Sequence, residues 1–171
     1  MPRMCFFSFH YVPDSVRASQ VRQIGTVEGN PPARDNDWET IVGGGDAAIK
    51  KWIAGQIFGR TCTVVLVGTG TANRKWINHE IIKSWDEGMG VVGIHIHGLK
   101  NFEQNESPKG SNPFEFITHG PTQRKLSSII KCYDPSGANS KERYAWISTH
   151  QANAVEEAIA IRKANKQLRF T

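Results

Sequence analysis

Short apolar runs and helical stripes of apolar residues alternate along the chain. Largely apolar runs occupy residues 5–9, 63–67 and 91–97, and a shorter one falls within residues 126–133. A continuous run of this length is typical of a strand that is buried on both faces of a sheet. The first three runs therefore predict central strands, and the fourth predicts a short last strand.

Between these runs, apolar residues recur at the spacing of a helix. The clearest stripe consists of Ile49, Trp52, Ile53 and Ile57, at positions i, i+3, i+4 and i+8. Gly59 follows it, and a glycine commonly ends a helix at that place. Helices are expected over residues 14–23, 46–59, 76–88 and 151–166.

This alternation of strands and helices predicts an α/β protein. Continuous apolar strands indicate a parallel sheet, and right-handed crossovers then give a doubly wound, three-layer α/β/α domain. The length of 171 residues suits one domain, so we expect a single domain over residues 1–171. Ligands of such sheets bind beyond the carboxyl ends of the strands, which draws attention to the segments after Phe9, Val67 and Ile96.

Two long segments interrupt the alternation. Residues 25–45 are rich in glycine and proline, and residues 99–123 are polar with several glycines and prolines. Loops of this length are unusual in a compact domain and are often functional. Because residues 25–45 also contain Trp38, we expect that loop to make a protein–protein contact.

Composition and charge fit a globular protein. Hydrophobic residues make up 39% and charged residues 22%, which argues against a disordered chain or a fibre. The net charge of +5 suits an anionic small molecule as well as nucleic acid. A basic group near the C-terminus, Arg162, Lys163, Lys166 and Arg169, is expected to be a solvated helix face. A nucleic-acid partner is not expected, because such sites combine a larger charge with interleaved aromatic residues.

The cysteines and the hydropathy favour a cytoplasmic protein without a membrane partner. Cys5, Cys62 and Cys132 are far apart and form no metal-ligand or redox motif, which suits a reducing compartment. The apolar N-terminus is too short for a secretory signal. No apolar run approaches the roughly 20 residues that span a bilayer.

Two other features fall short of a metal or phosphate motif. His95 and His97 share one face of a strand, but no third ligand stands at a recognisable spacing, so we expect packed histidines and no metal. The Gly68–Gly70 turn after a strand lacks the full dinucleotide fingerprint and the phosphate-loop lysine. A simple turn before the next helix is therefore expected there.

Several segments, taken in order, resemble one family. The most specific segment is residues 71–81 (TANRKWINHEI), which follows a buried strand. The others are FFSFHY at 6–11, DWE at 37–39, DAAIKKWI at 46–53 and VVLVG at 64–68. Together they resemble the TIR-like family that includes the TIR subunit of the bacterial Thoeris anti-phage system. The clear resemblance covers residues 4–100.

The resemblance implies a flavodoxin-like fold and an enzyme that cleaves NAD. Enzymatic members break the nicotinamide–ribose bond and either release ADP-ribose or cyclise it into a signalling nucleotide. The family's catalytic glutamate corresponds to Glu80, and the tryptophan of its Trp-x-x-x-Glu motif corresponds to Trp76. The substrate-binding residues implied in this way are Trp76, Ser8, Phe9, His10, Tyr11 and Gly68. NAD is then the substrate, and no cofactor is expected.

The chemistry of these residue types suits the implied reaction. Residues i and i+4 lie one helical turn apart, so Trp76 and Glu80 should face one cleft. The tryptophan face can stack on a flat base or a pyridinium. An ionised, solvent-reachable Glu80 could stabilise the cationic ribose that forms as the bond breaks. Nicotinamide leaves from a pyridinium and needs no proton, so one carboxylate is sufficient.

Two alternatives stay open. One is a non-catalytic TIR-like module for homotypic assembly, and the other is an enzyme similar to nucleoside deoxyribosyltransferases. Intact Trp76 and Glu80 favour the NAD-cleaving enzyme. In that case we expect a homo-oligomer formed through residues 25–45, a phage-derived trigger, and an effector protein that senses the nucleotide product.

Overall fold

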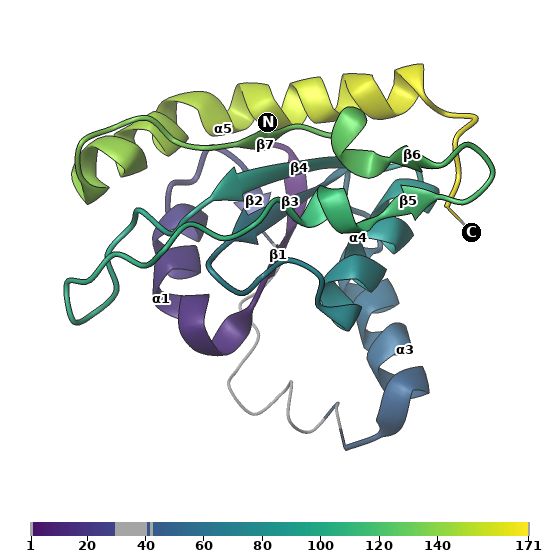
Figure 1. Ribbon diagram of the computed structural model, residues 1–171, viewed down its shortest axis with the longest axis horizontal. Helices are drawn as coiled ribbons and strands as arrows, with labels where there is room; N and C mark the ends of the chain where they lie inside the picture. The colour runs from purple at the N-terminus through teal and green to yellow at the C-terminus, as the bar shows by residue number, and fades with distance from the viewer. Residues whose placement is uncertain (1, 30–40, 42, 171) are drawn as a thin grey trace.

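A parallel five-stranded sheet forms the centre of the molecule (Figure 1). The computed structural model describes residues 2–29, 41 and 43–170. In sheet order the strands are β2 (Glu28–Gly29), β1 (Met4–Phe9), β3 (Cys62–Val67), β4 (Gly90–His95) and β7 (Cys132–Tyr133). All four neighbouring pairs are parallel. The predicted α/β, doubly wound fold is confirmed.

Helices cover both faces of the sheet. They are α1 (Tyr11–Arg22), α3 (Gly45–Ile57), α4 (Lys75–Asp86) and α5 (Ser140–Ala164). Helices α1 and α5 pack on one face, whereas α3 and α4 pack on the other. The segment between β4 and β7 holds two short 3-10 helices, η1 (Pro113–Phe116) and η2 (Leu126–Ser128), and the antiparallel pair β5 (Thr118–His119) and β6 (Arg124–Lys125). The layers are therefore α/β/α.

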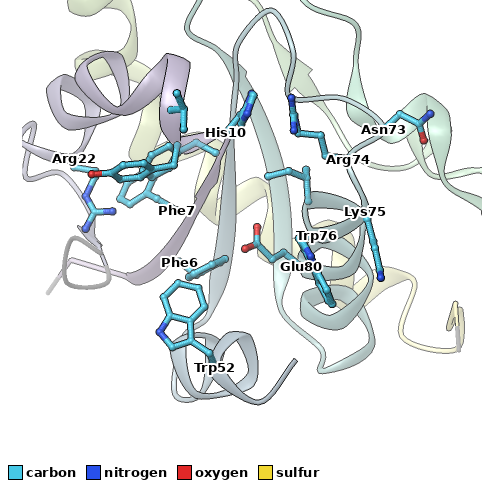
Figure 2. Close-up of a pocket in the computed structure, with 14 residues that line it drawn as sticks. Phe6, Phe7, His10, Arg22, Trp52, Asn73, Arg74, Lys75, Trp76 and Glu80 are labelled. Carbon is cyan, nitrogen blue, oxygen red and sulfur yellow. The ribbon is translucent and has the colours of Figure 1, made fainter. Parts of the chain in front are cut away.

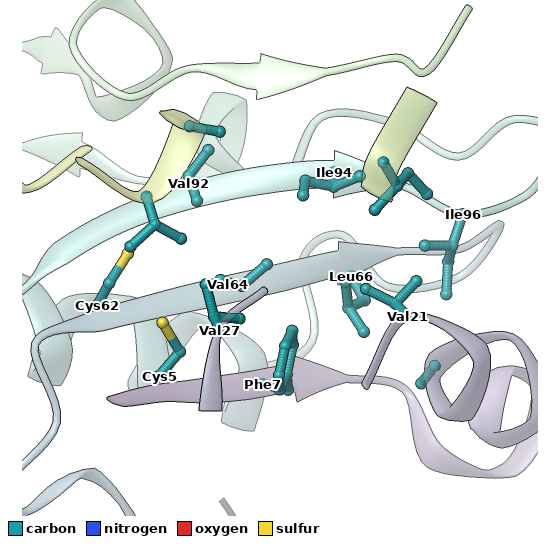
Figure 3. Close-up of a cluster of buried hydrophobic side chains, with 14 of the residues drawn as sticks. Cys5, Phe7, Val21, Val27, Cys62, Val64, Leu66, Val92, Ile94 and Ile96 are labelled. Carbon is teal, nitrogen blue, oxygen red and sulfur yellow. The ribbon is translucent and has the colours of Figure 1, made fainter. Parts of the chain in front are cut away.

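The alternation of side chains along each strand divides the core. Cys5 and Phe7 of β1 face the layer of α1 and α5, together with Val64 and Leu66 of β3. Figure 3 shows these side chains beside those of β4 in one continuous cluster. Residues one position along point to the opposite face, because successive side chains in a strand alternate. Phe6, for example, joins the cluster that α3 covers.

The strand order creates the place for a ligand. The chain leaves β1 through α1 to the edge strand β2, and returns through α3 to β3 on the other side of β1. The direction of winding therefore reverses between β1 and β3, and ligands of doubly wound sheets bind at that point, beyond the carboxyl ends of the strands. The register pairs Phe9 with Leu66, so both strands end at the same level.

Two predicted segments differ from the structure. The predicted loop over residues 25–45 contains the strand β2, which is too short to show a periodic pattern in the sequence. Residues 30–40 and 42 of this segment, including Trp38, lie outside the described residues. In the predicted last strand over residues 126–133, η2 forms first and only β7 pairs with the sheet. The strands β2 and β7 consist of two residues each. They form because they pair with neighbouring strands of the sheet, which a local pattern cannot predict.

The last helix begins earlier than the predicted residue 151. It starts after Asn139, whose side chain accepts a hydrogen bond of 2.9 Å from the backbone N–H of Glu142. Arg162 was expected on a solvated face, but it is buried: its Nε donates to the carbonyl of Trp85 at 2.7 Å, and its guanidinium covers that indole ring. Among the described residues, no helix has the length and apolar content of a membrane-spanning segment.

The close contact of α5 with β4 gives a test of the core. A Cβ on Gly90 would lie 2.7 Å from the backbone nitrogen of Ile159, so Gly90→Ala must displace the helix. We expect this change to lower the free energy of unfolding by about 1–3 kcal/mol. Urea unfolding should show this loss. Gly55→Ala is the matched control, because Gly55 is exposed in α3 and no described atom lies within 4 Å of its Cβ position. The control should be neutral or stabilising by up to about 1 kcal/mol.

Candidate active site

A cavity of about 510 Å³ opens where β1 ends, between α1 and α4. Its walls come from β1 and both ends of α1, from one residue of α3, and from residues within 73–80 at the start of α4. Five of the residues predicted from the sequence line it: Phe9, His10, Tyr11, Trp76 and Glu80. The fold therefore brings the segment after the first strand against the Trp-x-x-x-Glu segment, although they are far apart in the sequence.

Glu80 lies in the second turn of α4 and points its carboxyl group toward β1 (Figure 2). Its side chain was expected to be ionised and open to solvent, but the residue is only 7% exposed. Burial raises the pKa of Glu80 to about 8, although a hydrogen bond from Ser8 opposes this shift. This buried position therefore favours the protonated, neutral form of the carboxyl group.

Ser8 fixes this carboxyl group from the side of β1. The residue is 1% exposed on β1, and its hydroxyl donates a hydrogen bond to Oε2 of Glu80. Ser8 does not belong to the cavity wall, in contrast to the direct substrate contact that the sequence suggested. Its place in the structure is that of a positioning residue, which fixes one oxygen of Glu80 and leaves the other for a ligand.

One end of the cavity is aromatic. Phe6, Trp52 and Trp76 line it and pack against a common apolar cluster on the α3 side of the sheet. Trp76 is half-buried, so its ring contributes both to this cluster and to the cavity wall. The edge of His79 contacts the same ring, with centroids 5.6 Å apart. We call Phe6, Trp52 and Trp76 the aromatic end.

The opposite end is cationic. There Arg74 precedes α4, and its Nε donates to the carbonyl of Gly70 at 2.7 Å. Next to it stands His10, whose pKa is lowered by burial and by the charge of Arg74. We call this end, which consists of the charged Arg74 and His10 beside it, the cationic end. Figure 2 shows it on the other side of Glu80 from Phe6 and Trp52.

Gly68, His95 at the end of β4 and His97 beyond it do not line this cavity. The backbone N–H of Gly68 donates to Oγ1 of Thr71 at 2.8 Å, and the glycine packs against Asp14, as in a structural turn. His95 and His97 meet edge to face at 5.6 Å, and burial lowers the pKa of His95 to about 4. Among the described residues, no group of three or more histidine, cysteine or acidic side chains is placed to hold a metal ion.

Several cavity residues escaped the sequence analysis, among them Phe6, Trp52 and Arg74. Trp52 was assigned to the apolar stripe of α3, and Phe6 to a buried strand, because nothing in their spacing distinguishes a cavity wall from a core. Arg74 stands two positions before Trp76, and this proximity in sequence was the available signal. Its direction toward His10 depends on the fold.

Comparison with known proteins supports a definite family. Residues 6–101 match the family model described as "Thoeris protein ThsB, TIR-like domain". A curated relative from Bacillus cereus (strain MSX-D12) is 36% identical over 161 residues, which cover 91% of this chain and 82% of the relative. That relative is named "Putative cyclic ADP-D-ribose synthase ThsB1". The matched region contains the whole cavity wall, from Phe6 to Glu80.

The burial of Glu80 makes stability depend on pH. Its pKa of about 8 in the folded protein exceeds the usual 4.5, so the folded state keeps a proton that the unfolded state loses. The stability contributed by this proton is complete below about pH 4.5 and is lost as the pH rises through about 8. Glu80→Gln, which remains neutral, should therefore melt at a higher temperature than the unchanged protein above pH 8, and the difference should shrink toward pH 5.

Thermal melts across this range measure the effect. Glu103→Gln is the control, because Glu103 is exposed on a loop away from the cavity. A melting difference for Glu80→Gln that stays constant with pH would contradict the buried neutral carboxyl group.

Proposed function

Because this chain belongs to the TIR-like domain family of the Thoeris protein ThsB, we propose that it cleaves NAD and converts the ADP-ribose part into a cyclic signalling nucleotide. The name of the relative from Bacillus cereus, a cyclic ADP-D-ribose synthase, supports this activity. The observation that carries the proposal is the carboxyl group of Glu80, held by Ser8 at the wall of a cavity with an aromatic end. Among the described residues, such a site offers one acidic group and a surface for a flat base.

The reaction breaks the bond between the nicotinamide nitrogen and C1′ of the ribose. Both electrons of the bond go to the pyridinium, which leaves as neutral nicotinamide, and positive charge develops on the ribose. An ionised Glu80 stabilises that charge. Because the substrate brings a positive pyridinium toward the carboxyl group, binding lowers the pKa of Glu80 and favours its ionised form.

The surroundings of Glu80 strengthen this interaction. The carboxylate loses most of its contact with water, and an ion in a poorly solvated site interacts more strongly with a neighbouring charge. The aromatic end offers Trp76 and Trp52 as stacking surfaces for the nicotinamide ring. An apolar wall also limits the water that could trap the cationic ribose, which favours attack by the adenine of the same molecule and hence cyclisation.

The proposal extends to defence against phage. Membership of the ThsB family supports a role in a Thoeris system, where we propose that the nucleotide product acts on an effector protein. We further propose that a phage-derived trigger starts the reaction and that copies of the chain assemble through residues 25–45. Residues 30–40 and 42 of that segment lie outside the described structure, so this part rests on the sequence.

Incubation of the pure protein with NAD tests the proposed activity. Mass spectrometry should detect free nicotinamide together with a cyclic product of ADP-ribose. Glu80→Gln keeps the size of the side chain but removes the charge, and we expect nicotinamide release to fall by at least about a hundredfold. Glu87→Gln is the matched control, because Glu87 caps the same helix at its far end and pairs there with Lys83.

The other outcomes separate the alternatives. Linear ADP-ribose as the product would leave NAD cleavage in place and remove cyclisation. Exchange of bases between nucleosides, with NAD unchanged, would identify a deoxyribosyltransferase. If Glu80→Gln cleaves NAD as fast as Glu87→Gln, the role assigned to Glu80 is wrong.

The pH profile tests the role of Ser8. If ionised Glu80 is the active form, kcat/KM, which reports the free enzyme, should rise with pH up to about 8. The profile of kcat should rise at a lower pH, because bound pyridinium favours the carboxylate. Ser8 lowers the pKa of Glu80 through its hydrogen bond, so Ser8→Ala should shift the rise in kcat/KM to higher pH. A variant with reduced activity but an unshifted profile would make Ser8 a packing residue.

A further inference from the structure

Glu80 separates two parts of the cavity wall that differ in chemistry. Figure 2 shows the carboxyl group of Glu80 between His10 and Arg74 on one side and Phe6 and Trp52 on the other. NAD has the same division, with a flat pyridinium on one side of the ribose and a doubly negative diphosphate on the other. The order of groups along the cavity thus matches the order of groups along the proposed substrate, and this match rests on the proposed function.

Arg74 has the geometry of an anion-binding residue. It is exposed at the mouth of the cavity, and its Nε is fixed by the carbonyl of Gly70 at 2.7 Å. Within the described part of the chain, no carboxylate forms a salt bridge with its guanidinium. A guanidinium held at one nitrogen presents its remaining N–H groups in a fixed direction, which suits bidentate binding of phosphate oxygens.

The other cations of the wall are engaged differently. Lys75 pairs with Asp46 at 2.5 Å, and its ammonium also stands 4.8 Å from the centre of the Trp76 ring. Arg22 lies over the ring of Phe7 at 5.7 Å. Both side chains are therefore directed to protein groups, and Arg74 is the cation that best fits an incoming anion.

His10 supplies a second, independent polar group at the same place. Its Nδ1 is buried and has no hydrogen-bond partner among the described residues. A Cβ built on Gly70 would lie 3.6 Å from this nitrogen and 3.9 Å from Nη2 of Arg74, so the two nitrogens border the same space. A buried polar atom without a partner is costly, and a phosphate oxygen would accept a hydrogen bond from a protonated Nδ1.

We propose that Arg74 and His10 bind the diphosphate of the dinucleotide and thereby set its direction in the cavity. The diphosphate at the cationic end places the adjoining ribose beside Glu80 and the nicotinamide at the aromatic end. Arg74 is then a specificity-determining residue, which favours dinucleotides over substrates that have the same scissile bond but no phosphate.

Nicotinamide riboside provides the comparison, because it contains the scissile bond without a phosphate. For Arg74→Gln, kcat/KM for NAD should fall roughly tenfold to a hundredfold, the loss expected for a charge-assisted hydrogen bond. The fall for nicotinamide riboside should be much smaller, so the ratio of the two kcat/KM values should drop. Arg74→Lys keeps the charge but not the forked geometry and should restore part of the ratio. Arg169→Gln, an exposed arginine outside the cavity wall, is the control and should leave the ratio unchanged.

A binding measurement without turnover keeps this proposal separate from the proposed function. Calorimetric titration with ADP-ribose and with adenosine should show weaker ADP-ribose binding in Arg74→Gln and in His10→Ala, with adenosine little affected. Absence of NAD cleavage by the unchanged protein would refute the proposed function, while this titration would still test the anion site. The anion site itself is refuted if Arg74→Gln and Arg169→Gln bind ADP-ribose equally well.

Discussion

The buried carboxyl group of Glu80 is the feature on which the rest of the site depends. It remains in place because α4 is fixed to the sheet on both sides of it: Ile77 and Ile81 are buried against the core, and Ser84 forms a 2.6 Å hydrogen bond with Thr63 of β3. The helix thus has little freedom to turn the carboxyl group toward water. The raised pKa of Glu80 follows from this one constraint, and so does the proposed shift toward the carboxylate when a cationic substrate binds.

The cavity combines groups that the chain supplies from separate elements. His10 belongs to the junction of β1 and α1, Trp52 to α3, and Arg74 to the segment before α4. They meet because the winding reverses between β1 and β3, so helices from both faces flank the end of β1. The polarity from aromatic to cationic end is therefore a product of the topology, and it gives the proposed reaction a direction for its substrate.

Membership of the Thoeris ThsB family and the chemistry of the site support each other. Cleavage of a pyridinium glycoside needs no acid to protonate the leaving group, whereas most glycosidases need two carboxyl groups. Among the described residues, Glu80 is the one carboxyl group on the cavity wall, which is consistent with this simpler requirement. The shielding that makes Glu80 a weak acid would also strengthen its interaction with a ribose cation.

The sequence by itself determined the fold class, the three central strands and the adjacency of Trp76 and Glu80, because these follow from local periodicity and helical spacing. It placed the β1 end next to that pair through the resemblance to a family. The tertiary structure decided the two-residue strand β2, the burial and protonation of Glu80, the placement of Ser8 behind it, and the approach of Arg74 to His10. Each of these depends on contacts between distant segments, and the pattern of one segment holds no information about the dielectric surroundings or partners that another segment provides.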